Sequence, residues 1–267
     1  MTTDFPVDTY SNMLPVDFPA PPVNPAPFGL YAVTAWTTED GPTRFLNGVQ
    51  VRNMGNYGGA DAFGVWGAPW CPPPPLDTEP RKEGTRPADL DPFDPIVVWA
   101  YDQCDARPGT QPEIEARAAQ ILRLEEQTAV ERTVADRLLM DADDLPGTLH
   151  TESNFRRAVC YLEAEAAKTN TMVWFHASPS WASDEPPGLV QKSGTSWVSP
   201  LGHTWIFGGG YVDGLQDTIV ATSRPFGWRN DPTVRSALAP HDNLYVAVAE
   251  RTVAIAYEAV IAAVSIG

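Results

Sequence analysis

Two groups of residues, a glycine cluster and the histidines, are of types that bind phosphate or metal ions in other proteins. The triplet Gly208–Gly210 is the only glycine cluster that resembles a phosphate-binding loop, but it lacks the GK[ST] ending of a P-loop and the GxGxxG spacing of a dinucleotide-binding turn. A tight turn is the favoured interpretation. The histidines are separated by 26, 27 and 38 residues, with no HxH or HExxH pattern, so packed or surface side chains are expected. They are His150, His176, His203 and His241.

The serines and carboxylates lack the neighbours that catalysis requires. No GxSxG elbow is present, and Ser178 and Ser180 begin what is expected to be a loop. The acidic pairs Glu125-Glu126 and Asp143-Asp144 resemble glycosidase carboxylates only by type, because adjacent residues of a helix point in different directions and cannot flank one bond. A solvated helix face is expected at both pairs.

The three cysteines fit neither a disulfide framework nor a metal knuckle. Cys71, Cys104 and Cys160 are an odd number at spacings of 33 and 56 residues, which favours a reducing compartment. Cys104 lies where a strand should lead to a helix N-terminus, but the negative charges of Asp102 and Asp105 oppose thiolate formation. We expect a buried or inert thiol, and we assign no catalytic, cofactor-binding or metal-binding residue in this chain.

The composition excludes several classes of protein. A formal net charge of −16 with only 18 Lys and Arg argues against direct DNA readout, which needs clustered cations. A hydrophobic content of 43% indicates a globular core, and Glu258 interrupts the C-terminal apolar stretch, so no membrane span is expected. The nine tryptophans suit a sugar-binding face or, equally, the core and subunit interfaces.

The first part of the chain is expected to be extended. Residues 1–27 contain seven prolines and have no basic or apolar region of a secretory signal, which predicts an extended arm. Leu30–Thr38 and Asn47–Arg52 have strand-like composition on either side of the turn-forming Asp40-Gly41-Pro42, which predicts a β-hairpin. Phe63–Trp66 is predicted to be a short strand, and the nine prolines from Pro69 to Pro95 indicate an irregular crossing.

One long helix dominates the middle of the chain. Ile96–Tyr101 is predicted to be a buried strand, and the helix should follow from Thr110 to about Met140, with Thr110 as N-cap and Glu113 completing a capping box. Glu113 and Arg117 are placed to pair at i,i+4. An apolar stripe at helical spacing predicts one packed side. Its members are Ile114, Ala118, Ile121, Leu124, Val130, Val134 and Leu138.

The rest of the chain is predicted to form an α/β unit and a closing pair of strands. A second helix has apolar residues at helical spacing and should end at Thr169-Asn170. These residues are Phe155, Val159, Leu162 and Ala166. Strands are predicted at Thr171–Ala177, within Leu201–Val212, and at Thr218–Thr222, Leu244–Ala249 and Arg251–Ile266.

This order of elements resembles the major capsid protein fold of tailed bacteriophages, which encapsulin nanocompartments share. Two segments carry most of the resemblance. Leu124–Met140 (LEEQTAVERTVADRLLM) is similar to the E-x-x-x-V/I-E-R/D-T/x run that closes the family's long spine helix. Glu250–Gly267 (ERTVAIAYEAVIAAVSIG) is similar to the family's last strand.

The resemblance implies an α+β fold with an N-terminal arm, an extended β-hairpin loop, a long spine helix in a peripheral domain, and an α/β axial domain. The corresponding ranges are an arm at 1–27, the extended loop and proline-rich crossing at 28–92, a peripheral domain at 93–147 and 242–267, and an axial domain at 148–241. Leu30–Trp66 would lie across a neighbouring subunit. Because that segment contains no lysine, we expect none of the loop-lysine cross-links that some family members form.

The function implied is structural and not enzymatic. The chain would be the major capsid subunit that self-assembles into the icosahedral head shell of a tailed bacteriophage enclosing double-stranded DNA. Its partners would be itself in hexamers and pentamers, a portal, a separate scaffolding protein, and DNA held without sequence-specific binding, with no cofactor and no membrane. It would be made in the host cytoplasm and reside in the virion. Two alternatives stay open, an encapsulin-type shell and a carbohydrate-binding or hydrolytic domain.

Overall fold

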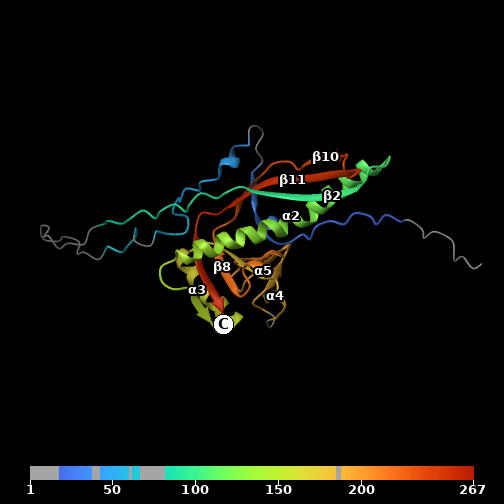
Figure 1. Cartoon of the computed structure of the whole chain (residues 1–267). Helices are drawn as coiled ribbons and strands as arrows, with labels where there is room; N and C mark the ends of the chain where they lie inside the picture. Colours follow the sequence, from blue (N-terminus) through green and yellow to red (C-terminus); the bar gives the residue numbers. More distant parts are fainter. Residues whose placement is uncertain (1–17, 38–42, 60–61, 67–81, 185–187) are drawn as a thin grey trace, which may run out of the picture.

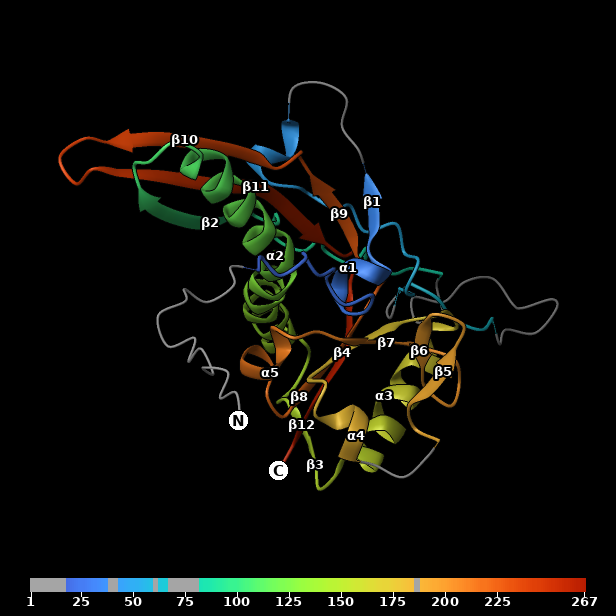
Figure 2. The ribbon, with the colours of Figure 1, turned by 90° about the vertical axis from the view of Figure 1, so that its right-hand side faces the viewer.

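A computed structural model describes residues 18–37, 43–59, 62–66, 82–184 and 188–267, which form two β-sheets with one long helix between them (Figure 1). This helix, α2, runs from Thr110 to Asp143 and has 34 residues. At 1.5 Å per residue it is roughly 50 Å long, so it contacts both sheets. Figure 2 shows α2 beneath the first sheet and above the second.

The first sheet is built around the long strand β11 (Leu244–Ala256). Strand β2 (Ile96–Asp105) pairs antiparallel with one edge of β11, and β10 (Thr233–Ala239) and β9 (Phe226–Arg229) pair antiparallel with the other. The short β1 (Ala35–Thr37) adds in parallel to β9. One face packs on α2 and buries apolar side chains of both elements. These include Val98, Ala100, Ala247, Ala249, Ile114, Ala118 and Leu122.

The second sheet has seven strands and is covered by helix α3 (Phe155–Thr169). In spatial order its strands are β3 (His150–Glu152), β12 (Val260–Ile266), β8 (Thr218–Thr222), β4 (Trp174–Ala177), β7 (Thr204–Phe207), β6 (Ser196–Val198) and β5 (Gln191–Ser193). Two one-turn helices, α4 (Trp181–Asp184) and α5 (Tyr211–Gly214), follow β4 and β7. The core between α3 and this sheet is aromatic. It includes Phe155, Phe175, Trp205 and Phe207.

The structure confirms both helices predicted from apolar spacing, α2 and α3, but α2 differs from prediction in part of its apolar stripe and in its N-cap. In α2 the stripe is buried except at Ile121 and Leu124, because Leu122 takes the inward position there. The predicted capping box is wrong. Gly109, with a φ of 91°, is the N-cap, and no side-chain cap is formed. Arg117 pairs with Asp102 of β2 (Nε–Oδ2 2.8 Å), which joins the helix to the sheet above it.

The predicted hairpin before the proline-rich crossing is wrong. Leu30–Val33 forms a helical turn, α1, and β1 pairs with a strand that lies far along the chain. Arg44–Asn47 is a 3-10 turn, and Val49 forms an isolated bridge with Phe93. Residues 63–66 are not a strand, and the predicted turn at 40–42 lies outside the described residues. Partners distant in sequence decide this region, which local composition cannot reveal.

Two other strands differ from prediction. The strand β2 is half-buried, because Val97 (58% exposed) and Trp99 (65%) face away from α2 and alternate with buried residues. The predicted terminal strand Arg251–Ile266 is divided, since β11 ends at Ala256 and β12 begins at Val260 in the other sheet. One continuous stretch of chain therefore contributes to both sheets.

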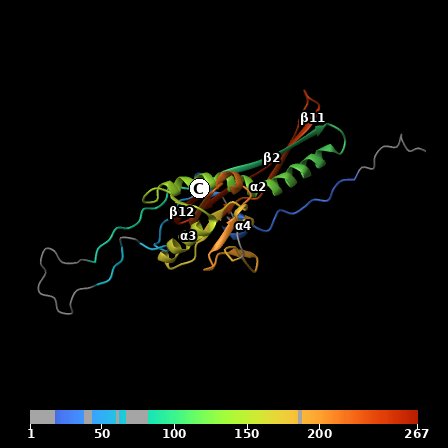
Figure 3. The ribbon, with the colours of Figure 1, turned by 90° about the horizontal axis from the view of Figure 1, so that it is seen from below.

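Two extended segments leave the body in opposite directions (Figure 3). Residues 18–28 run along α2 toward the end of the first sheet. At the other end an extended loop has an outgoing limb, residues 43–59 and 62–66, and a returning limb, residues 82–95. Within the described ranges, no helix combines the length and apolar character needed to cross a bilayer.

Candidate functional site

The triple glycine packs against α2 and does not form an open anion cradle. A Cβ at Gly210 would lie 2.3 Å from the carbonyl oxygen of Thr128 and 2.5 Å from the amide nitrogen of Arg132, so only glycine allows this approach. The Gly210 amide, which a phosphate would need, donates to Glu131 Oε2 at 3.0 Å. The glycines thus bring the turn between β7 and α5 onto the helix.

His176 is fully buried in a hydrogen-bonded chain. The Thr222 hydroxyl donates to the carbonyl of Ser223 (2.8 Å), so it must accept from His176 Nε2–H (2.8 Å). The His176 Nδ1 atom then accepts from the Tyr211 hydroxyl at 2.8 Å. Burial lowers the pKa of His176 to about 3, which keeps the ring neutral. The role of this side chain is structural.

The other described histidines are also separate from one another. His150 contacts Glu152 (Nε2–Oε1 2.9 Å) and stacks on Tyr161, whereas His203 Nδ1 accepts from the amide of Val173. In the part of the chain that the structure describes, no three His, Cys, Asp or Glu side chains are grouped to hold a metal ion.

The remaining chemical candidates also lie apart. Ser178 and Ser180 bond to each other (Oγ–Oγ 2.8 Å). Cys104 and Cys160 are exposed, so of the expected buried or inert thiol at Cys104 the buried alternative is wrong, while Cys71 lies outside the described residues. Glu125 is exposed as expected, and so are Asp143 and Asp144. Glu126 contradicts the expected solvated face because it is buried.

The buried Glu131 joins three segments of the chain. Its Oε1 atom accepts from the Leu30 amide (2.9 Å) and from Gln127 Nε2 (2.8 Å), and its Oε2 atom accepts from the Gly210 amide. Burial raises the pKa of Glu131, and these hydrogen bonds act in the opposite direction. One carboxylate therefore fixes α1 and the glycine turn to α2.

Glu126, one turn earlier on α2, makes the corresponding contact with the first sheet. It accepts from the hydroxyl of Tyr31 at 2.7 Å and pairs with Arg251 of β11 (Nη1–Oε2 3.1 Å). Tyr31 packs edge-to-face on Trp36, and the guanidinium of Arg229 lies 4.2 Å from the Trp36 ring centroid. The segment that enters the extended loop is thereby held on both α2 and the first sheet.

The returning limb of the loop is held near the C-terminal end of α2. Arg137 donates to the carbonyls of Asp91 (2.7 Å) and Pro92 (2.9 Å), and its guanidinium lies 4.1 Å from the ring centroid of Phe93. Its Nε atom pairs with Asp141 Oδ1 at 2.8 Å, and Tyr257 donates to Asp141 Oδ2 at 2.6 Å. This cluster connects the loop to the break between β11 and β12.

Glu258, in that same break, holds the outgoing limb. It accepts from the amides of Met54 (2.8 Å) and Asn56 (3.3 Å), and Asn56 Nδ2 also donates to it at 2.7 Å. The Ser223 hydroxyl oxygen accepts from the Glu258 amide at 2.7 Å. Sequence reasoning used Glu258 only as an interruption of an apolar run. An acidic residue within such a run was the signal for this anchor.

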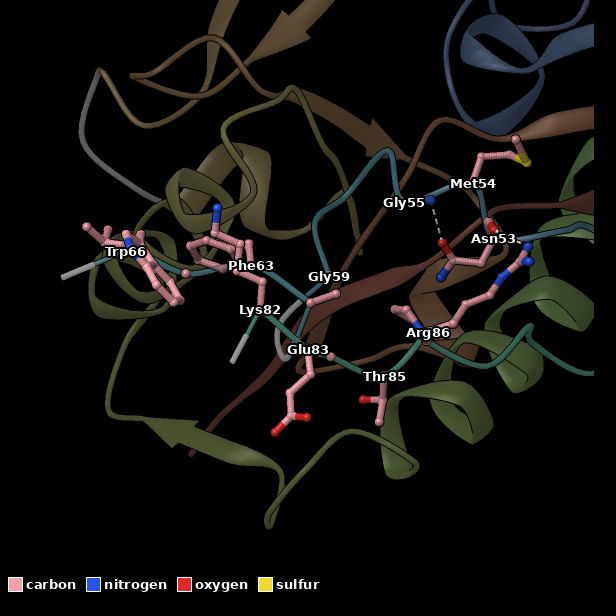
Figure 4. Close-up of a pocket in the computed structure, with 15 residues that line it drawn as sticks. Asn53, Met54, Gly55, Gly59, Phe63, Trp66, Lys82, Glu83, Thr85 and Arg86 are labelled. Carbon is pink, nitrogen blue, oxygen red and sulfur yellow. Dashed lines mark hydrogen bonds between the residues drawn. The ribbon is translucent and has the colours of Figure 1, made fainter. Parts of the chain in front are cut away.

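An open groove of about 940 Å³ lies between the two limbs of the extended loop (Figure 4). Its apolar lining is unusually accessible, with Phe63 82% and Val65 98% exposed. Trp66 also lines it, and the ammonium of Lys82 lies 5.1 Å from the Trp66 ring centroid. Exposed apolar side chains beside the cations Lys82 and Arg86 suit contact with another chain.

Comparison with known proteins finds similarity in structure only. No family model matches the sequence, and no curated protein matches it. The capsid of an empty GTA particle superposes with a TM-score of 0.54 at 12% identity, over 93% of this chain and 98% of that one. A solved structure of Microbacterium phage Oxtober96 gives 0.52 at 11% identity, over 94% of this chain and 95% of that one.

The mature capsid of bacteriophage PhiM1 gives a TM-score of 0.50 at 10% identity, over 95% of this chain and 91% of that one. At identities this low, the superpositions establish the fold alone. Their coverage shows that the shared fold includes almost the whole chain. The α+β arrangement of a long helix, two sheets and two projecting segments is therefore the major capsid protein fold of tailed bacteriophages.

Proposed function

We propose that this chain is the major capsid subunit that self-assembles into the icosahedral head shell of a tailed bacteriophage. The observation that carries the proposal is the agreement in fold with the GTA capsid over 93% of this chain and 98% of that one. The exposed apolar side chains of the extended loop support it, because a monomer leaves Phe63 and Val65 in water. The similarity to capsid structures also supports a non-enzymatic role.

The proposal includes further partners and a location. Copies of the chain would form hexamers and pentamers around a portal, with a scaffolding protein during assembly. The shell would enclose double-stranded DNA without sequence-specific contacts, which suits a subunit with a net charge of −16. The chain would be made in the host cytoplasm and reside in the virion.

We propose the same division into domains as the resemblance implies, with a peripheral domain at 93–147 and 242–267 and an axial domain at 148–241. The pairing of three strands does not follow these domain boundaries. Strands β9 and β10 pair into the sheet of the proposed peripheral domain, and β12 pairs into the sheet of the proposed axial domain. The three strands therefore cross the proposed boundary.

Electron microscopy of the purified chain with light scattering, at several concentrations and salt levels, tests the proposal. Closed shells, tubes, or rings of five or six subunits are expected, both for the chain alone and with a co-expressed scaffold. Persistent 29 kDa monomers with and without scaffold would contradict it. Shells that co-purify with a cargo enzyme and never with DNA would favour the encapsulin alternative. Heat released on titration with glycans would favour the carbohydrate-binding alternative.

A further inference from the structure

The proline-rich N-terminal segment is tied to α2 along only half of its described length. Gln120 and Arg123 donate to the carbonyl of Val23, and Gln127 donates to the carbonyl of Phe28 at 2.8 Å. Within the described part of the chain, Phe18–Pro22 has no hydrogen bond to the body, and the Phe18 side chain is 77% exposed. The free half therefore presents its side chains to solvent.

The sequence of this free segment favours one conformation, and an acidic residue precedes it. Prolines at 19, 21 and 22 fix their own φ angles and bias the preceding residues toward polyproline II, and Pro19 and Pro22 have PxxP spacing. Asp17 precedes the segment, and no Lys, Arg or His occurs before Arg44. The segment is thus a stiff, aromatic ligand that follows an acidic residue and has little conformational entropy to lose on binding.

The groove of the extended loop has complementary properties. Its aromatic and apolar lining includes Met54, Phe63 and Trp66, and Lys82 and Arg86 outnumber the single acid Glu83 (Figure 4). Proline-rich segments dock in aromatic-lined grooves because proline rings pack on aromatic faces without ordering a flexible chain. The cations of this groove would pair with the acidic flank.

The segment cannot reach the groove of its own chain. From Phe28 at Gln127 to Val23 at Gln120, the segment runs toward the N-terminal end of α2. The loop is held by Arg137, near the opposite end of a helix roughly 50 Å long. Figures 1 and 3 show the two segments projecting in opposite directions. Only a second copy can bring them together, in a head-to-tail contact.

We propose that the N-terminal segment Phe18–Pro22 of one copy docks as a polyproline helix in the groove lined by Met54, Phe63, Trp66, Lys82 and Arg86 of a second copy. The inference rests on the proposed function, since the contact would join subunits of a shell. The occupant of the groove would then be a segment of a neighbouring copy.

A labelled peptide of residues 12–22, titrated into the full-length chain and followed by fluorescence anisotropy, tests the contact without requiring shells. Trp66→Ala and Lys82→Glu should each weaken binding at least about tenfold, and added salt should weaken it further. Trp99→Ala is the matched control, because Trp99 is also exposed (65%) but lies on β2, and it should leave binding unchanged. Absent binding, or equal loss with Trp99→Ala, would overturn the inference.

Photo-crosslinking identifies the same contact in the assembled state. A benzoylphenylalanine at position 18 in mixed heavy- and light-isotope chains should give heavy-to-light links to residues 53–66 or 82–87. The same probe at Phe28, beside Gln127, should link within one chain. Shells whose position-18 links go elsewhere, or to another protein, overturn the inference and leave the proposed function standing. Peptide binding in a chain that never assembles would support the contact and contradict the function.

Discussion

At the scale of single residues, the chain uses buried carboxylates to hold irregular segments in place. Glu131 and Glu126 lie on the packed side of α2, and Glu258 lies between two strands. Each accepts from backbone amides or hydroxyls of segments that have little regular structure of their own. Such segments cannot satisfy their polar groups internally, so a charged acceptor on a rigid element does so.

Replacing Glu131 should destabilise the chain strongly. Glu131→Ala leaves the Leu30 and Gly210 amides buried without an acceptor, which is expected to lower the free energy of unfolding by at least about 3 kcal/mol. Glu131→Gln keeps one acceptor oxygen and should lose less. Urea denaturation monitored by circular dichroism measures both. An alanine variant as stable as the exposed-site control Glu125→Ala would contradict this role.

The neutral His176 should make stability depend on acid. Its pKa is about 3 in the folded chain and 6.5 in the unfolded chain, so the unfolded chain binds more protons between these values. Stability contributed by His176 is therefore complete above pH 6.5 and declines as pH falls toward 3, by up to about 1.4 kcal/mol per unit. The raised pKa of Glu131 acts with the opposite sign.

Denaturation at several pH values separates the contribution of His176 from that of Glu131 if the wild type is compared with His176→Gln. This variant should lack the part of the pH dependence of stability that comes from His176. His241→Gln, at an exposed position of the β10–β11 turn, is the control and should keep it. A ring resonance of His176 that titrates near pH 6 in NMR spectra would contradict a buried neutral histidine.

At the scale of elements, α2 is the surface on which the glycine turn after β7 is positioned. Gly210→Ala would place a methyl group against the backbone of Thr128 and Arg132, where neither atom can rotate away. We expect a loss of at least about 2 kcal/mol in the free energy of unfolding. Gly64→Ala is the control, because no atom lies within 4 Å of its Cβ position, and denaturation should show little change. Equal stability of the two variants would contradict this close approach.

The Glu258 anchor should control the mobility of the outgoing limb of the extended loop. Glu258→Gln removes the charge and one acceptor from the Met54 and Asn56 contacts, so amide exchange at residues 53–56 should accelerate several-fold. Hydrogen–deuterium exchange measured by mass spectrometry reports this. The control is Glu83→Gln at an exposed position in the other limb, which should leave amide exchange at residues 53–56 unchanged. Unaltered exchange in the Glu258 variant would show that other contacts hold the limb.

The sequence predicts the elements that depend on local periodicity, and it fails where distant partners decide. Helices α2 and α3 follow from apolar residues at three- and four-residue spacing. The hairpin prediction failed because β1 pairs with β9, about 190 residues further along, and because Glu131 fixes the start of α1. Glu126 was assigned to a solvated face, since its burial depends on Arg251, which no local pattern connects to it.

At the scale of the whole molecule, the extended loop determines how subunits can be joined. Leu30–Trp66 contains no lysine, so the predicted shell should lack covalent links between loops. Assembled shells boiled in detergent should run as a single band near 29 kDa on a denaturing gel. A ladder of covalent oligomers would contradict this. The stability of the shell would then depend wholly on noncovalent contacts, of which the proposed segment-in-groove contact is one.

The division of the C-terminal stretch between two sheets also has a consequence for biosynthesis. Strand β11 is the centre of the first sheet, and β12 lies between β3 and β8 in the second. In chain order each follows every other strand of its sheet, so neither sheet is complete on the nascent chain before residues 244–266 have emerged. Polypeptides that stop before residue 244 would lack the central strand of the first sheet and the strand that joins β3 to β8 in the second, and a growing lattice would receive only subunits whose translation had passed this point.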